Sequence, residues 1–420
     1  MNRRSFLALP ALAPLFLPPR LLAATTQTER KFLFILADGG WDPTYVFAPV
    51  FGSDDVDIEE DAVETTVNGI TFVDQENRPV TRGFFESWGD RCCLLNGFEV
   101  RSVTHERCKR LVLTGKSQAD ADDWPSRVVR TGEGYALPHL VISGPAYTAT
   151  YTTSVMRIGE NGQLGALADG SALEIADEAV AAFSVGADAT EAYVRARVEA
   201  HNRRASRGRA AVFATDLARS YEQVDLVGQL IGEIDLASGS NGAEGLVSVA
   251  TRAEPALVCM ERGYSRCAIV AHGGQYDAGW DTHSDNEDQS DHFETLFQDL
   301  DEIVQSASAK TGAGGGSLLD ELCIVVLSEM GRTPKLNSTN GKDHWTFTSA
   351  LFIGAGIGGG RVLGGYDSRL VGRPIDLGTG APDDTAGVSM GAEHLGSTIL
   401  AIAGVDLEAD DPPAVEAVIG

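Results

Sequence analysis

Six short runs of the chain are almost entirely apolar and lack the alternation of a half-exposed strand. Buried strands of a parallel sheet that is covered on both faces carry this pattern. Between the runs, apolar residues recur at three- and four-residue steps, as in 293–303, which predicts amphipathic helices. The runs span 32–37, 92–95, 140–143, 268–271, 323–327 and 351–353. We therefore predict an α/β fold with a mostly parallel central sheet and helices on both faces.

Residues 25–420 are long enough for one large domain, with about 172–236 as an insertion. Within the insertion, apolar residues from Phe213 to Ile234 recur at helical spacing. We interpret it as a helical cap beside the sheet. A basic cluster in it either recognises an anionic partner or forms a solvated helix end; its members are Arg203, Arg204, Arg207 and Arg209.

The first 24 residues have the pattern of a twin-arginine export signal. Arg3 and Arg4 precede an apolar run that extends to Leu22 and is interrupted by prolines. An uncleaved anchor and a general secretory signal are the alternatives. The run falls short of the ~20 apolar residues that a membrane span needs, so we expect no stable span. The sequence thus predicts export by the twin-arginine translocase to the periplasm or the exterior.

Charge and cysteine content exclude several classes of protein. The formal net charge is −27, and removing the first 24 residues would delete three arginines and no acid. So acidic a surface repels nucleic acid and anionic lipid. An anionic substrate must then be attracted locally, by a metal ion or an arginine. Six cysteines in 420 residues do not make a disulfide scaffold, and Cys267 and Cys323 fall within predicted strands, as buried thiols do.

Polar residues follow the predicted strands where ligand-binding groups of an open α/β sheet lie. Asp38 ends the first run, Glu329 follows Leu327 closely, and Asp343 and His344 precede the run at 351–353. Asp281 and His283, two residues apart, face the same side of an extended chain. Carboxylates and imidazoles that converge from separate strands are typical of metal-assisted hydrolysis. The sequence therefore predicts a divalent metal site, for Zn, Mn, Mg or Ca.

Two segments carry a resemblance to a known family. The stretch from Cys323 to Asp367, together with the Gly-Trp-Asp-Thr-His segment ending at His283, resembles the domain of unknown function 1501 family. That family belongs to the alkaline phosphatase-like superfamily of metallohydrolases. The likeness extends from about Lys31 to Val405 and implies an alkaline phosphatase-like fold.

The resemblance also implies roles for the metal ligands. It makes Asp38 a ligand, with Asp42 as the alternative, and places Glu329 where relatives have a ligating aspartate. Met330 stands where relatives have a histidine and cannot bind a hard cation in its place. One ligand of the usual two-metal site is therefore missing, and Asp343 with His344 would restore one.

The expected nucleophile is absent from the pattern. Sulfatase-like members carry a cysteine or serine nine residues before the threonine of a Leu-Thr-Gly stretch, and here His105 stands nine residues before Thr114. His105 would bind metal or form a phosphohistidine, and Thr104 would be the nucleophile if the register shifts by one. Lys109 stands where sulfatases have an arginine that steadies the nucleophile. Arg332 would hold a substrate anion or pair with a carboxylate.

These features predict an exported, metal-dependent hydrolase of small anionic phosphate or sulfate esters. A metal ion that activates water would require no side-chain nucleophile. The first alternative is a non-catalytic exported protein that keeps the fold and binds metal. The second is a transferase or mutase that works through His105.

Overall fold

The structure is a computed structural model that describes residues 29–130, 134–158, 189, 192–200, 203, 248–276 and 279–420. The predicted signal peptide at 1–24 lies outside these residues. So does most of the predicted insertion at 172–236, including the helical pattern from Phe213 to Ile234, although residues 192–200 are helical. Both remain predictions.

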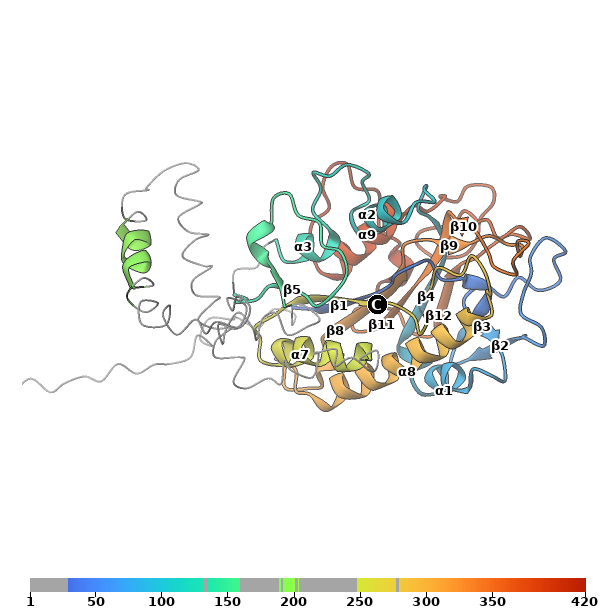
Figure 1. Ribbon diagram of the computed structural model, residues 1–420, viewed down its shortest axis with the longest axis horizontal. Coiled ribbons are helices and arrows are strands. Elements are labelled where there is room, and N and C mark those ends of the chain that lie inside the picture. The colour runs from blue at the N-terminus through green and yellow to red at the C-terminus, as the bar shows by residue number, and fades with distance from the viewer. Residues whose placement is uncertain are drawn as a thin grey trace, which may run out of the picture.

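An eight-stranded sheet forms the centre of the molecule (Figure 1). Its order is β12-β4-β11-β8-β1-β7-β5-β6, and every neighbouring pair is parallel except the two pairs that β11 makes with β4 and β8. Its strands are β1 (Lys31–Ala37), β4 (Cys92–Glu99), β5 (His139–Val141), β6 (Val155–Arg157), β7 (Cys267–His272), β8 (Leu322–Ser328), β11 (Phe347–Gly354) and β12 (Arg361–Gly364). The mostly parallel sheet confirms the predicted fold class.

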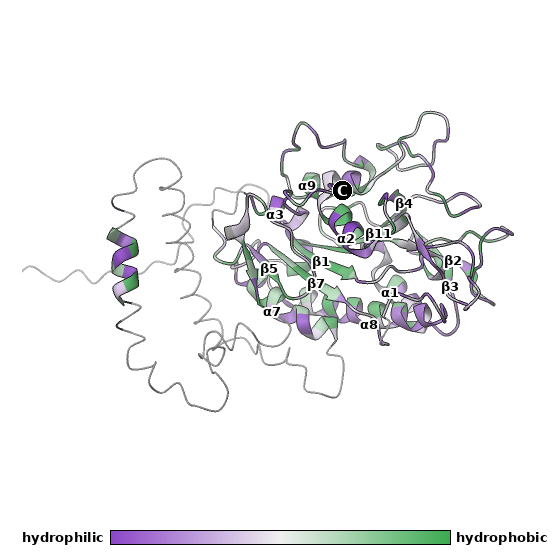
Figure 2. Cartoon of the chain, turned by 45° about the horizontal axis from the view of Figure 1, so that its top comes forward, coloured by the Kyte–Doolittle hydropathy of each residue, from purple (hydrophilic) through white to green (hydrophobic). Residues whose placement is uncertain are grey.

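Helices cover both faces of this sheet, as Figures 1 and 2 show. On one face lie α1 (Pro79–Trp88), α7 (Val249–Glu261) and α8 (Asp288–Ala309), which pack against one another. On the other lie α2 (His105–Thr114), α3 (Trp124–Val128) and α9 (Ala392–Ile402). Two small two-stranded sheets complete the fold and consist of β2 (Val63–Val67) with β3 (Ile70–Asp74), and β9 (Gly331–Arg332) with β10 (His344–Trp345).

The central strands are apolar throughout because each contributes to two cores. In β1, Leu33 and Ile35 pack into the core on the α8 side, whereas Phe32 and Phe34 pack into the core on the α9 side. All seven residues of β1 are buried, which is why the run shows no alternation. Two glycines, Gly39 and Gly40, follow closely after the strand. A Cβ at Gly39 would lie 2.9 Å from the backbone nitrogen of Asp281.

The six cysteines are free and buried. Cys92 and Cys93 belong to the two different cores, because neighbouring side chains of a strand point to opposite faces. In the part of the chain that the structure describes, no helix combines the length and the apolar character that crossing a bilayer would demand.

The direction of the strands fixes where a site can form. Because β1, β7 and β8 are parallel, their carboxyl ends lie at one edge of the sheet, and the antiparallel β11 begins at that same edge. The loops that carry the predicted metal ligands therefore meet there, as expected for an open α/β sheet.

Candidate metal centre

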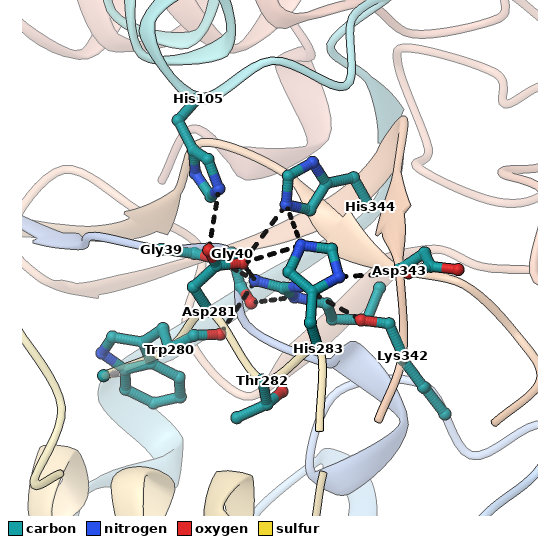
Figure 3. Close-up of polar contacts among 12 residues, drawn as sticks. Gly39, Gly40, His105, Trp280, Asp281, Thr282, His283, Lys342, Asp343 and His344 are labelled. Carbon is teal, nitrogen blue, oxygen red and sulfur yellow. Dashed lines mark hydrogen bonds and ion pairs between the residues drawn. The ribbon is translucent and has the colours of Figure 1, made fainter. Parts of the chain in front are cut away.

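Loops that follow β1, β7 and β8 meet the start of α2 and of β10 at the carboxyl edge of the sheet (Figure 3). Through them, eight of the nine predicted site residues come together: seven form one connected set of polar contacts, and Asp38, whose own contact is with Lys109, lies within electrostatic range of Glu329 and His105. These residues are Asp38, His105, Asp281, His283, Glu329, Arg332, Asp343 and His344.

The imidazole rings of His283 and His344 approach each other through their Nε2 atoms. Their Nε2 atoms are 2.9 Å apart, and Asp281 Oδ1 lies 3.3 Å from the first and 3.2 Å from the second. Each ring is fixed from behind: Nδ1 of His283 is 3.0 Å from Asp343 Oδ1, and Nδ1 of His344 is 2.7 Å from the carbonyl oxygen of Val103. Since both partners only accept, each Nδ1 carries the hydrogen and each Nε2 presents a lone pair.

His105 is oriented in the same way. Its Nδ1 lies 2.8 Å from Glu329 Oε1, so Nδ1 donates and Nε2 presents a lone pair. This Nε2 is buried, has no hydrogen-bond partner among the described residues, and is 3.4 Å from Asp281 Oδ2. The hydrogen bond to Glu329 raises the pKa of His105, with Asp281 adding to the effect. Both carboxylates therefore favour a positive charge at Nε2.

These four residues, which we call the imidazole cluster (His105, Asp281, His283 and His344), have the composition of a metal site. One ligand atom from each of His105, Asp281 and His344 lies within 4.8 Å of the others, and His283 contacts two of these three residues. Ligand atoms ~2.1 Å from a tetrahedral ion lie about 3.4 Å from one another, close to the distances between Asp281 and the three imidazoles. Facing lone pairs repel unless a proton or a cation lies between them. Ligands whose far nitrogen is bonded to a carboxylate or carbonyl are typical of metal-binding histidines. The residues present therefore fit a divalent ion.

Arg332 links Asp281 of the cluster to the loops that surround it. Its guanidinium is completely buried and donates to Asp281 Oδ1 at 2.6 Å. It also donates to carbonyl oxygens of Gly39, Gly40 and Lys342, and so ties together three separate loops. Burial raises the pKa of Asp281, but the hydrogen bond and charge of Arg332, together with His344 and His105, outweigh burial and lower the pKa. Of the two predicted roles for Arg332, the structure shows the pairing with a carboxylate.

Asp38 and Glu329, which we call the carboxylate pair, lie on the other side of His105. Glu329 is fully buried and accepts from His105 and from the backbone nitrogen of Gly39 at 3.0 Å, while the hydroxyl of Ser328 donates to the carbonyl oxygen of Ala37 at 2.7 Å. Asp38 Oδ1 lies 2.6 Å from the ammonium group of Lys109. Burial and the nearby charge of Glu329 raise the pKa of Asp38, against the hydrogen bond from Lys109. The protein's own donors thus surround this pair.

The remaining predicted positions lie off the cluster. Asp343 stands behind His283 as its hydrogen-bond acceptor. Thr104 is the exposed N-cap of α2, and its hydroxyl does not cap the helix. Asp42, the alternative to Asp38, is buried in a separate ion pair with Lys342 at 2.7 Å. Met330 is buried in the core on the α9 side.

Sequence reasoning missed three supports of this site. The contact of Glu329 with His105, the Lys109 ion pair and the carbonyl of Val103 behind His344 all depend on where α2 lies relative to the sheet. One local signal was available. His105 and Lys109 are four residues apart, so they share a face if the segment is helical.

Comparisons with known proteins give one family assignment. The model of the family described as "Protein of unknown function (DUF1501)" matches residues 64–409. No curated protein matches the sequence.

Several solved structures overlap the chain at low identity. The C-terminal periplasmic domain of EptC from Escherichia coli is 9% identical, with a TM-score of 0.42, over 93% of this chain and 86% of that one. An alkaline phosphatase superfamily protein from Vibrio parahaemolyticus is 13% identical, with a TM-score of 0.40, over 93% and 72%. The lipoteichoic acid synthase LtaP from Listeria monocytogenes is 9% identical, with a TM-score of 0.40, over 92% and 74%.

Likenesses with such low identities and TM-scores assign no activity, and the fold assignment rests on the central sheet of this chain. The family model, by contrast, spans most of the sequence, and the predicted family is thereby confirmed: the protein belongs to the DUF1501 family.

Proposed function

We propose that this protein is an exported, metal-dependent hydrolase of phosphate or sulfate esters. The observation that carries the proposal is the convergence of three imidazole Nε2 atoms on the carboxylate of Asp281, each with its Nδ1 already committed. The ester class comes from the resemblance of the motifs to alkaline phosphatase-like proteins. Export comes from the paired arginines at Arg3 and Arg4.

Each side chain of the site has a role in this proposal. His283, His344 and Asp281 would hold a divalent ion, with His105 completing the set. A bound ion would polarise the ester and lower the pKa of a water molecule. Asp343 and Glu329 keep the imidazoles in the tautomer that presents Nε2. Arg332 keeps Asp281 ionised and in place.

A non-catalytic metal-binding protein is the second candidate, and one observation favours it. His105 stands where relatives carry a nucleophile, and its ring is fixed between Glu329 and Asp281. The site thus contains no hydroxyl or thiol at that position. Transfer through a phosphohistidine would require Nε2 of His105 to attack a substrate while this atom lies 3.4 Å from Asp281 Oδ2. The carboxylate of Asp281 would repel an incoming anion.

The experiment has two stages. Protein that has been dialysed against Zn²⁺ or Mn²⁺ is analysed for bound metal, beside the double variant His283→Ala, His344→Ala. We expect stoichiometric metal in the wild type and loss of at least 90% of it in the variant. Asp320→Asn, at the opposite edge of the sheet, is the matched control and should keep its metal.

The second stage tests turnover. The metal-loaded protein is incubated with aryl phosphates and aryl sulfates, with and without a chelator. Turnover that the chelator abolishes supports the hydrolase. Metal binding without turnover of any ester would favour the non-catalytic alternative, and the absence of bound metal in the wild type would refute both.

A further inference from the structure

The carboxylate pair was expected to supply metal ligands, but each carboxylate already has a donor of the protein. Glu329 accepts from the imidazole of His105, and the backbone nitrogen of Gly39 lies within 3.2 Å of both its oxygens. Asp38 Oδ1 is paired with Lys109 at 2.6 Å. The negative charge of the pair is thus met by a cation of the protein, in contrast to the open Nε2 atoms of the imidazole cluster.

The ammonium group of Lys109 is the positive charge beside the carboxylate pair. The side chain of Lys109 is only 15% exposed, and the side chain of Asp38 31%. The ammonium group lies 2.6 Å from Asp38 Oδ1, and because a lysine side chain ordinarily loses its proton only near pH ~10.4, the group is positively charged at neutral pH. A divalent cation bound to Asp38 would lie within a few ångströms of this ammonium group, where the two positive charges repel each other, more strongly than in water because the site is partly desolvated.

The position of Lys109 is built into the helix. Lys109 follows His105 by four residues in α2, so both side chains project from one face of the helix toward the strand ends. Met330, where the resemblance implies a histidine ligand, is fully buried in the core on the α9 side. A thioether does not bind a hard cation. Beside the carboxylate pair the chain thus supplies a fixed cation, and position 330 supplies no ligand.

We propose that the centre holds one divalent ion, in the imidazole cluster, and that the ammonium group of Lys109 takes the place of a second ion beside the carboxylate pair. The inference rests on the proposed function and adds to it the number of ions and the reason for that number. It makes Lys109 a residue that excludes metal, and Asp38 its counter-charge.

The test counts ions in the folded protein by native mass spectrometry after loading with Zn²⁺ alone. We expect one ion per chain in the wild type, and none after His283→Ala, His344→Ala. Two ions per wild-type chain would overturn the inference and leave the hydrolase intact. No ion in the wild type would instead refute the proposed function, so the two failures are distinguishable.

A pair of variants isolates the ammonium group. Met330→His restores a ligand while Lys109 remains, and we expect one ion. Adding Lys109→Met removes the charge at nearly constant volume, and we expect a second ion. Lys116→Met, which removes an exposed ammonium just past the same helix, is the control at one ion.

Two results would contradict the role of Lys109. One is a second ion in Met330→His alone, and the other is no second ion when both substitutions are present. If the buried histidine impairs folding, judged by the melting temperature, Lys109→Met is compared with the wild type instead. Weak binding of a second Zn²⁺ is then expected in the variant only, and equal binding would refute the proposal.

Discussion

Two groups of three histidines in the described part of the chain differ in burial and in the hydrogen-bond partners of their ring nitrogens. His105, His283 and His344 are partly exposed, and each Nδ1 faces an acceptor, which leaves Nε2 open. His272 and His292 are buried, and each Nδ1 accepts from a backbone nitrogen, at Gly274 and Gln275. The third of the buried group, His139, has no hydrogen-bond partner at either nitrogen among the described residues.

The difference between the two groups lies in the tautomer and not in the residue type. In His292, Nδ1 accepts and Nε2 donates to the carbonyl of Gly279, so no lone pair remains. In the imidazole cluster the order is reversed. Burial lowers the pKa of His272 to about 3 and that of His292 to about 4, so these rings stay neutral and brace the loop that leads to Asp281.

The largest effect is expected from removing the cation that holds the imidazole cluster in place. Arg332→Met would leave the carboxylate of Asp281 and several carbonyl oxygens without their donor. The guanidinium is fully buried but the side chain of Asp281 is 37% exposed, so the cost comes mainly from buried acceptors left without a donor. This cost is about 1–3 kcal/mol, and we expect the free energy of unfolding in urea to fall by that amount. Arg332→Lys keeps the charge but loses several of the guanidinium's donors, and its loss should be intermediate. A loss below ~1 kcal/mol for Arg332→Met would contradict this role.

The next effect tests the tautomer directly. Asp343→Asn leaves the size of the side chain unchanged, but its amide can donate to Nδ1 of His283 and so turn the lone pair away from the cluster. Loss of such a supporting partner typically weakens metal binding 10–100-fold. We expect this range for the Zn²⁺ dissociation constant by titration against a competing chelator. Asp320→Asn serves as the control, and equal affinities of the two variants would refute the assignment of the tautomer.

A buried histidine should instead affect stability and its dependence on pH. His139 is fully buried, and burial lowers its pKa to about 3, whereas an unfolded histidine has a pKa of about 6.5. Below that value the unfolded chain takes up a proton that the folded chain does not. The stability contributed by the neutral ring is therefore complete above pH ~6.5 and is lost as the pH falls, by about 1.4 kcal/mol per pH unit.

His139→Leu removes this titration and an unsatisfied buried imidazole. We expect the variant to be more stable than the wild type by about 1 kcal/mol at pH 7. Between pH 6.5 and 4.5 its free energy of unfolding should fall less steeply than that of the wild type. The difference between the two should be constant from pH 7 to 8, which is the internal control. Parallel curves down to pH 4.5 would show that His139 is not buried as a neutral ring.

Six strands of the sheet could be predicted from the sequence, because a doubly covered parallel strand has no polar face to interrupt the apolar run. The 32–37 and 323–327 runs therefore became β1 and β8 with boundaries shifted by a residue. The runs at 92–95 and 351–353 covered only parts of β4 and β11, and β6 and β12 were not predicted. The joint position of Asp281 and His283 followed from their two-residue spacing.

The partners of these residues could not be predicted in the same way. Whether Asp38 faces a metal or Lys109 depends on how α2 packs over the sheet, and more than 60 residues separate the two. The tautomer of His344 depends on a single carbonyl, that of Val103, for which the sequence gives no signal. Local sequence patterns thus specify which residues lie at the carboxyl ends of the strands. Tertiary packing decides which of their side chains are left without a partner from the protein.

The smallest effect is expected at Thr104, the residue that would be the nucleophile if the register were shifted. Its hydroxyl is exposed and does not cap α2, so Thr104→Ala removes no buried contact. Surface substitutions of this kind usually change stability by less than about 0.5 kcal/mol. If water is the nucleophile, kcat on an aryl ester should change less than twofold, whereas a nucleophilic Thr104 requires a loss of several orders of magnitude. A large loss of kcat at unchanged metal content would identify Thr104 as the nucleophile, and the open Nε2 of His105 would then have to be assigned to the general base.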